Sequence, residues 1–262
     1  MVESLDVEAR LTLCNMAVEF SAFTGIIAPD TKVFEYLKGR PYAPVDELWE
    51  QAMEYWSTLA TDQGAHFDRE IIIDCADIAP TVTWGTSPQH AISIDGQVPA
   101  LISGDSDSRR SMEQALNYMG LESGQSIEGL PIQAAFIGSC TNSRLSDLRI
   151  AADILKGRKV SANVRAICVP GSTQVKLAAE KEGLDRIFLD AGFEWRESGC
   201  SMCFYAGGEG FLSGERVITS TNRNFEGRQG PKCRSHLASP ATVAASALNG
   251  TITDVRKLEH ST

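Results

Sequence analysis

Residues 131–157, PIQAAFIGSCTNSRLSDLRIAADILKG, determine the fold class that we expect for this chain. The short apolar run at 131–138 predicts a buried strand, and the apolar positions of 143–157 recur at the spacing of an amphipathic helix. The same order returns downstream, with expected strands at 163–171 and 215–222 and expected helices at 172–183 and 239–250. Almost continuously apolar strands that alternate with helices predict an α/β fold, in which a parallel sheet is covered by helices.

The first part of the chain predicts a second, smaller unit. Apolar residues at helical spacing indicate helices at 7–23 and 45–60, and the run EIIID at 70–74 indicates a strand that ends in a turn. The polar stretch SGDSDSRRS at 103–111 is rich in turn-forming residues and is the expected boundary. We therefore predict a partial N-terminal α/β unit at 1–110 and an α/β/α domain at 111–262.

Composition excludes several classes of partner. The net charge of −10, from 24 basic and 34 acidic residues, argues against nucleic acid or an anionic membrane as the main partner. No apolar run approaches the ~20 residues that a membrane-spanning helix needs. The first residues, MVESLDVEARL, are acidic and do not resemble a secretory signal, so we expect the cytoplasm. A small anionic substrate stays compatible, because a few local arginines outweigh the overall charge.

The cysteines are expected to be reduced, because their number is odd and no export signal is recognisable. Cys140 stands out, since it follows the strand predicted at 131–138 and is surrounded by small hydrogen-bonding residues rather than by apolar ones. In open parallel sheets, ligands bind outside the carboxyl ends of the strands. Residues 169–173 and 219–225 also follow predicted strands, so the sequence places Cys140 at an edge where three strand ends meet. The seven cysteines are Cys14, Cys75, Cys140, Cys168, Cys200, Cys203 and Cys233.

Cys200 and Cys203 form a C-x-x-C pair, which by itself is ambiguous. It is compatible with half of a zinc site, with a redox-active pair, with two ligands of an iron–sulfur cluster, or with incidental thiols. No second close pair of ligands completes a structural zinc site, and the residues after Cys203 are poor helix formers. Together with Cys140 the pair makes three thiolates, which would leave one iron of a cubane cluster open as a Lewis acid.

Two arginines follow the last predicted strand. Arg223 and Arg228 flank a glycine-containing turn, and the planar guanidinium suits bidentate binding of a carboxylate. The alternative is a pair of solvated surface arginines. Asn15 and Glu19 share one face of the first predicted helix, which by default is an exposed polar stripe. The GGEG segment at 207–210 lacks the context of a phosphate-binding loop and is expected to be a turn.

Several long motifs resemble a known family. The segments at 136–160, 192–203 and 219–230, which include FIGSCTNSR, SGCSMC and STNRNFEGRQG, resemble the large subunits of 3-isopropylmalate dehydratases in the aconitase superfamily. Earlier segments at 14–20, 34–44 and 77–88 resemble the same family in the same order. The resemblance covers nearly the whole chain.

The resemblance implies a set of site residues and a reaction. Cys140, Cys200 and Cys203 would ligate a [4Fe–4S] cluster, and Arg223 and Arg228 would bind substrate carboxylates. Asn222, Asn15 and Glu19 would lie around the cluster, the last two with catalytic roles. The implied reaction is that of a hydro-lyase, which dehydrates and rehydrates a 2-hydroxy dicarboxylate. The best-known case converts 2-isopropylmalate to 3-isopropylmalate in leucine biosynthesis.

The family also implies a partner and shows departures. A separate small subunit completes the active site, in a heterodimer or heterotetramer, and contributes the base that abstracts the proton. A DSHT-like motif of the family's N-terminal part is absent here, so the resemblance implies that the sequence begins partway through the family pattern. The segments FYAGGEGF at 204–211 and PKCRSHL at 231–237 also depart from it.

These departures leave three alternatives. The first is a fragment or short form of the large subunit, expected to be inactive without the upstream segment and the small subunit. The second is a catalytically inactive remnant that binds a cluster or zinc and acts as an interaction module. The third is a thiol oxidoreductase that uses only Cys200 and Cys203. The choice among malate-type substrates depends on a pocket to which the partner contributes.

Overall fold

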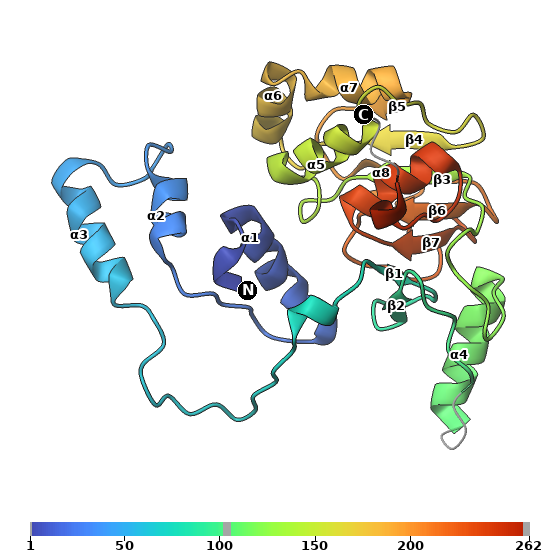
Figure 1. The fold of residues 1–262 in the computed structure, drawn as a ribbon, viewed down its shortest axis with the longest axis horizontal. Helices are drawn as coiled ribbons and strands as arrows, with labels where there is room; N and C mark the ends of the chain where they lie inside the picture. The colour runs from blue at the N-terminus through green and yellow to red at the C-terminus, as the bar shows by residue number, and fades with distance from the viewer. Residues whose placement is uncertain (1, 102–105, 259–262) are drawn as a thin grey trace. The chain divides into compact units, whose positions relative to one another are not determined.

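The computed structural model describes residues 2–101 and 106–258. Its contacts divide the chain into two compact units, Met1–Asp77 and Ile78–Thr262 (Figure 1). This division lies upstream of the boundary expected near residue 110. Val82, Trp84 and Ile94 are buried in the core of the second unit and tie the segment after residue 78 to it. Of the expected boundary stretch, residues 103–105 lie outside the described residues and residues 106–111 begin a helix.

The regular secondary structure in the described residues of the first unit consists of helices alone. It contains α1 (Val7–Met16), α2 (Thr31–Leu37) and α3 (Asp46–Ser57), with short 3-10 helices at Val2–Ser4, Ala17–Phe20 and Cys75–Asp77. Asp6 and Asp30 cap α1 and α2 by accepting hydrogen bonds from backbone amides. The helix predicted at 7–23 changes to 3-10 geometry after Met16. The strand predicted at 70–74 is wrong, because no neighbouring strand within residues 2–77 offers backbone hydrogen-bond partners.

The second unit is built on a parallel sheet of five strands, which confirms the predicted α/β fold. The strands lie in the order β5-β4-β3-β6-β7, and every neighbouring pair is parallel. An antiparallel hairpin of β1 (Thr81–Thr83) and β2 (Ala91–Ser93) precedes it. The sheet strands are β3 (Ala134–Ile137), β4 (Arg165–Cys168), β5 (Phe193–Trp195), β6 (Arg216–Thr219) and β7 (Arg234–Leu237).

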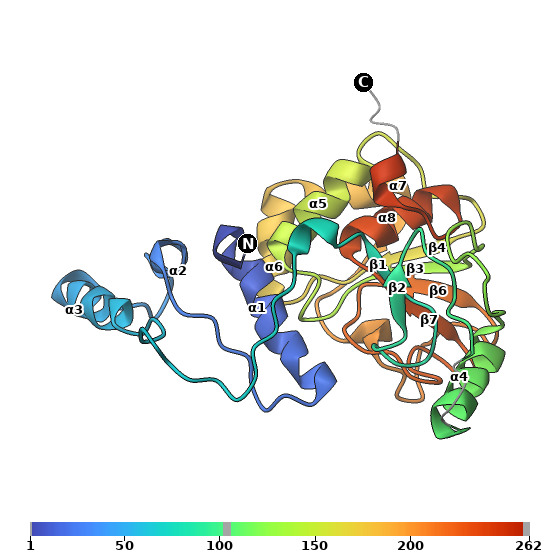
Figure 2. The ribbon, with the colours of Figure 1, turned by 60° about the horizontal axis from the view of Figure 1, so that its bottom comes forward.

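Helices cover one face of this sheet. Figure 2 shows α5 and α8 side by side over the strands. Gly250 ends α8 in the left-handed conformation, as its position predicts. No helix in the described part of the chain is long and apolar enough to cross a membrane. The helices of this unit are α4 (Ser106–Met119), α5 (Leu145–Leu155), α6 (Thr173–Lys181), α7 (Leu184–Ala191) and α8 (Pro240–Asn249), with further 3-10 helices at Ser201–Cys203 and Val255–Lys257.

Alternate side chains of the strands point to two different cores. In β3, Ala135 and Ile137 belong to the main apolar cluster, which also holds the inner faces of α4, α5 and α8. Ala134 and Phe136 belong to a second cluster, which is completed by Met202 and other side chains from the segments that follow β5 and β6. The loop that carries Cys200 and Cys203 is therefore anchored in a core and is not a free surface loop.

The strand order has one topological switch point. From β3 the chain moves outward through β4 to β5, and it then returns to place β6 on the other side of β3. The loops after β3 and β6 therefore leave the sheet in opposite directions at its carboxyl edge. In open α/β sheets this is where a crevice forms and ligands bind.

Gly230 is expected to be a sensitive glycine of the segment between β6 and β7. Its φ of 148° is rarely adopted by other residues, and an added Cβ would lie 2.2 Å from the backbone oxygen of Phe211. Gly230→Ala should therefore lower the free energy of unfolding by about 2 kcal/mol or more, through strain and overpacking. Urea unfolding followed by tryptophan fluorescence measures it. Gly208→Ala is the matched control, because no heavy atom lies within 4 Å of its added Cβ; an equal effect of both variants would contradict the argument.

Candidate metal centre at the carboxyl edge of the sheet

The loop after β3 exposes Cys140 on a rigid base. Ser139, directly before it, has a φ of 93°, and Ser139 and Thr141 are both buried while Cys140 is exposed. The two hydroxyl groups lie 2.7 Å apart and hydrogen-bond to each other. A left-handed serine is costly and persists only where the surrounding contacts enforce it. The small polar neighbours of Cys140 thus shape the turn that presents the thiol.

Ser220 links this loop to the loop after β6. The backbone N–H of Gly138 donates to Ser220 Oγ at 3.0 Å, and that hydroxyl lies 2.9 Å from the Gly138 carbonyl oxygen. The Asn142 side chain donates to the Ser220 carbonyl at 2.9 Å. On the other side, Ser143 Oγ donates to the carbonyl of Val169, after β4, at 2.8 Å. The three strand ends that the sequence placed at one edge are therefore neighbours and hydrogen-bonded to one another.

Ser220→Ala is expected to loosen the Cys140 loop. The variant leaves the buried Gly138 N–H without its acceptor, which should cost about 1–3 kcal/mol of stability. Hydrogen exchange of the amides at 138–142 should rise in the same variant. Ser213→Ala, an exposed serine before β6, is the control. Unchanged exchange at 138–142 in Ser220→Ala would show that the hydroxyl does not hold this loop.

The loop after β5 holds Cys200 and Cys203 in one short turn. The Cys203 N–H donates to the Cys200 carbonyl at 2.8 Å, within the 3-10 helix region that follows Cys200. Cys200 is exposed, whereas Cys203 is only 8% exposed and belongs to the second apolar cluster. The pair therefore presents one thiol at the surface and one at the rim of the core.

Arg228 lies against Cys203. Its Nε donates to the Cys203 carbonyl at 2.8 Å, and its Nη2 is 3.5 Å from Cys203 Sγ. The rings of Phe204 and Phe225 flank the guanidinium at 5.9 and 5.4 Å. A cation beside a thiolate stabilises its negative charge. The structure thus gives Arg228 a contact with a candidate metal ligand, while its role toward a substrate carboxylate stays a prediction.

The other predicted residues are distributed over both units. Asn222 and Arg223 lie in the loop after β6, half-buried and exposed respectively. Asn15 is the exposed penultimate residue of α1, and Glu19 is half-buried in the 3-10 helix that follows. Their catalytic roles also stay predictions.

The donor residues near the strand ends differ from those of a site for a single metal ion. In the described residues, no group of three His, Cys, Asp or Glu side chains could hold a single metal ion. In a cubane cluster each thiolate binds a different iron, so its ligands stand further apart than those of one ion. Cys140, Cys200 and Cys203 are free thiols that follow β3 and β5, whose carboxyl ends lie at the same edge. This donor set fits an iron–sulfur cluster.

Cys168 and Cys233 are poorer candidates for metal ligands. Burial raises the pKa of Cys168 well above its ordinary value and that of Cys233 to about 11. Both therefore stay protonated at neutral pH and are poor metal ligands. Two buried polar atoms on the loops after β3 and β6, Arg144 Nε and Asn224 Oδ1, lack a hydrogen-bond partner among the residues described.

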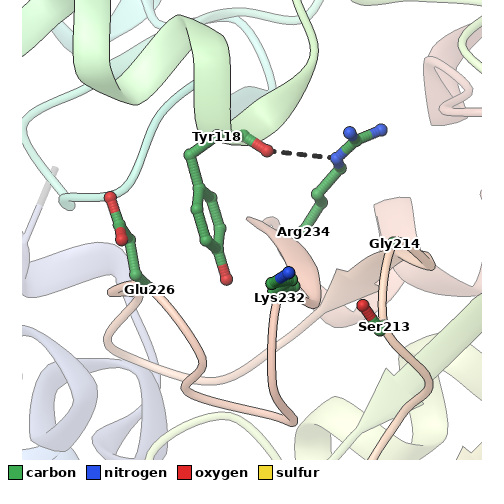
Figure 3. Close-up of a pocket in the computed structure, with 6 residues that line it drawn as sticks. All are labelled: Tyr118, Ser213, Gly214, Glu226, Lys232 and Arg234. Carbon is green, nitrogen blue, oxygen red and sulfur yellow. Dashed lines mark hydrogen bonds between the residues drawn. The ribbon is translucent and has the colours of Figure 1, made fainter.

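A pocket of about 500 Å³ lies at the opposite edge of the sheet (Figure 3). Its lining includes Ser213, just before β6, and Lys232, just before β7. Tyr118 bridges to the Cys233 carbonyl and the Gly227 N–H, and Arg234 Nε donates to the Tyr118 carbonyl at 3.1 Å. These contacts fasten the C-terminal end of α4 to the sheet. The pocket contains none of the predicted site residues.

Comparisons with known proteins agree with this architecture. The model of the aconitase family (aconitate hydratase) matches residues 1–250. The chain belongs to the aconitase family. It is 65% identical to the 3-isopropylmalate dehydratase large subunit of Cupriavidus necator, over 98% of this chain and 96% of that relative. It is 54% identical to 3-isopropylmalate dehydratase large subunit 1 of Bradyrhizobium diazoefficiens, over 98% of this chain but only 54% of that relative.

For this aconitase-family chain, the sequence identified the candidate cysteines and arginines, but it did not identify the residues that hydrogen-bond to their loops. Ser220 and the contact between Arg228 and Cys203 depend on pairings far apart in the chain. Glu209 was read as part of a turn, yet it forms ion pairs with Arg165 and Arg196. The only sequence signal for Glu209 was that it departs from the family pattern.

Proposed function

We propose that this chain is the cluster-binding part of an iron–sulfur hydro-lyase, formed with a small subunit, that converts 2-isopropylmalate to 3-isopropylmalate in leucine biosynthesis. The observation that carries the proposal is that three free cysteines lie on the loops that follow β3 and β5, with Cys140 directly after β3 and Cys203 against Arg228. The names of two similar proteins support the substrate. The cytoplasm is the proposed location.

The chemistry balances without a redox step. Dehydration removes a hydroxyl from one carbon and a proton from its neighbour, and rehydration returns them in exchanged positions. When bound, a [4Fe–4S] cluster with one iron free of cysteine supplies the Lewis acid that helps the hydroxyl to leave.

This chain's own residues would bind and orient the substrate. Arg223, on the exposed loop after β6, offers a planar fork for one carboxylate, and Asn222 beside it offers an amide. Arg228 holds Cys203 and leaves its remaining donor capacity for a second carboxylate. Glu19 would donate a proton to the departing hydroxyl so that it leaves as water, and Asn15 would hydrogen-bond that hydroxyl, while the small subunit would supply the base that takes the carbon-bound proton.

A second candidate is an inactive module that binds a cluster or zinc and acts through interaction alone. The chain spans about half the length of the Bradyrhizobium relative. Both candidates require the cysteines to bind metal. They differ in whether a substrate is converted.

Anaerobic reconstitution with iron and sulfide tests both candidates. The full chain should take up about four irons per molecule, with matching acid-labile sulfide. The reconstituted chain is then assayed for conversion of 2-isopropylmalate, alone and together with a small subunit and the part of the Bradyrhizobium relative that this chain does not match. Conversion with both additions supports the hydro-lyase. A stable cluster or bound zinc without conversion supports the inactive module, and a folded chain that binds neither contradicts both.

A further inference from the structure

The segment that carries Cys200 and Cys203 is closed at its base by an ion pair. Arg196 follows β5 directly, and Glu209 lies in the turn after the cysteines. Arg196 Nη1 donates to Glu209 Oε2 at 2.7 Å and Nη2 donates to Oε1 at 2.9 Å. This bidentate pair joins the two ends of the loop at residues 197–208.

Two further charges fix the closing pair to the sheet. Arg165, at the start of β4, donates to Glu209 at 2.8 Å and to Glu194 of β5 at 2.7 Å. Glu194 also pairs with Arg196. The two arginines hold the pKa of the Glu209 carboxyl at about 2, so Glu209 stays charged at neutral pH. The network thus attaches Glu209, at the C-terminal end of the loop, to both β4 and β5.

Exposure decides how large the effect of this network is. The Glu209 side chain is 51% exposed and that of Arg196 is 23% exposed, and isolated surface pairs contribute little to global stability. Here the geometry is bidentate and four charges act together, the arrangement in which such pairs have measurable effects. The expected consequence is local: the loop stays closed, while the stability of the whole fold changes little.

We propose that Glu209 is a positioning residue that keeps the Cys200–Cys203 turn closed and Cys203 shielded, through its bidentate pair with Arg196 and its bond to Arg165. Arg228, in the loop after β6, donates a hydrogen bond to the Cys203 carbonyl. Glu209 holds the C-terminal end of the same segment through its pair with Arg196. Because the ends of the loop are already joined, a ligand that binds the cysteines does not have to overcome the entropic cost of closing the loop. The purpose of this closure rests on the proposed function, but the closure itself does not.

Alkylation of the reduced, metal-free full chain tests the inference. In Glu209→Gln, the rate of Cys203 modification by iodoacetamide, followed by peptide mass spectrometry, should rise about fivefold or more as the loop opens. Exposed Cys200 should react quickly in both proteins, and buried Cys168 and Cys233 should react slowly in both. Glu209→Asp should fall between wild type and Glu209→Gln.

Glu182→Gln is the matched control, because it breaks another bidentate pair, with Arg149, on the helical side of the sheet. An unchanged Cys203 rate in Glu209→Gln, or an equal rise in Glu182→Gln, would overturn the inference. Iron uptake is measured in parallel. A wild-type chain that takes up no iron, together with faster Cys203 alkylation in Glu209→Gln, would remove the proposed function and leave the role of Glu209 intact.

Discussion

Replacing Cys140 by serine is expected to abolish cluster assembly, with iron falling from about four to below about one per chain. A serine hydroxyl is a poor substitute for a thiolate on iron, and Cys140 is the only one of the three proposed ligands that follows β3. Cys140 is exposed, so the fold should tolerate the change. Iron and acid-labile sulfide after anaerobic reconstitution measure the effect, and circular dichroism reports whether the fold is retained.

Cys75→Ser serves as the control for Cys140→Ser. Cys75 is a free, partly exposed thiol in the first unit and has no proposed role. It should leave the iron content unchanged. Full iron content in Cys140→Ser would remove Cys140 from the ligand set. Loss of iron in both variants would point to nonspecific uptake by surface thiols.

Acid is expected to destabilise the second unit through His236, which is completely buried. His236 Nε2 accepts a hydrogen bond from Arg216 at 2.7 Å, so Nδ1 must carry the proton that it donates to the Thr83 carbonyl at 2.6 Å. The ring is therefore neutral in the folded protein. Burial, reinforced by the charge of Arg216, lowers the pKa of His236 to about 3.

The direction of the pH effect follows from this lowered pKa. The unfolded chain binds a proton at His236 below about pH 6.5, and the folded chain does not until about pH 3. Stability should therefore fall as the pH drops through this window, with a slope that approaches about 1.4 kcal/mol per pH unit and a total on the order of 5 kcal/mol. Urea unfolding between pH 6.5 and 5 measures the contribution of histidine to the free energy of unfolding, because paired carboxylates lose their contribution only at lower pH.

His236→Gln should flatten this slope, although the variant will be less stable at neutral pH because it disturbs the bond to buried Arg216. His66→Gln is the control, since His66 is exposed in the first unit. Buried His90, whose pKa is also lowered by burial, accounts for the pH dependence that remains. A slope in His236→Gln equal to that of wild type would show that His236 does not control acid stability.

The sequence predicted those parts of the fold in which local pattern and tertiary packing agree. The strand at β3 and the helix at α5 have apolar residues that match their periods, and both elements form where expected. The run at 70–74 has the residues of a strand, but Ile72 is 98% exposed and finds no neighbouring strand. Local strand propensity fails there because a sheet requires a partner.

The elements that the sequence did not predict are those whose stability depends on distant contacts. The sequence of β7, RSHL, contains Arg234 and His236, residue types that are usually found at the surface. His236 can be buried because both nitrogens of its ring form hydrogen bonds, one with Arg216 and one with the carbonyl of Thr83. The helix α4 starts in a polar stretch and buries only its later residues, such as Leu116. The same holds for the candidate site. The cysteines form a recognisable sequence motif, whereas the contacts of Ser220 and Glu209 with other loops cannot be predicted from local sequence.

The strand order also sets the sequence of events in folding. The bond between Gly138 and Ser220 joins residues 82 positions apart, whereas β3, β4 and β5 follow one another along the chain. Contacts of long sequence separation form late, because the intervening chain must first be ordered. During synthesis, the loop that carries Cys140 therefore emerges long before Ser220, which fastens it. The loop after β3 is therefore fastened by Ser220 only after β6 has been synthesised and has paired with β3.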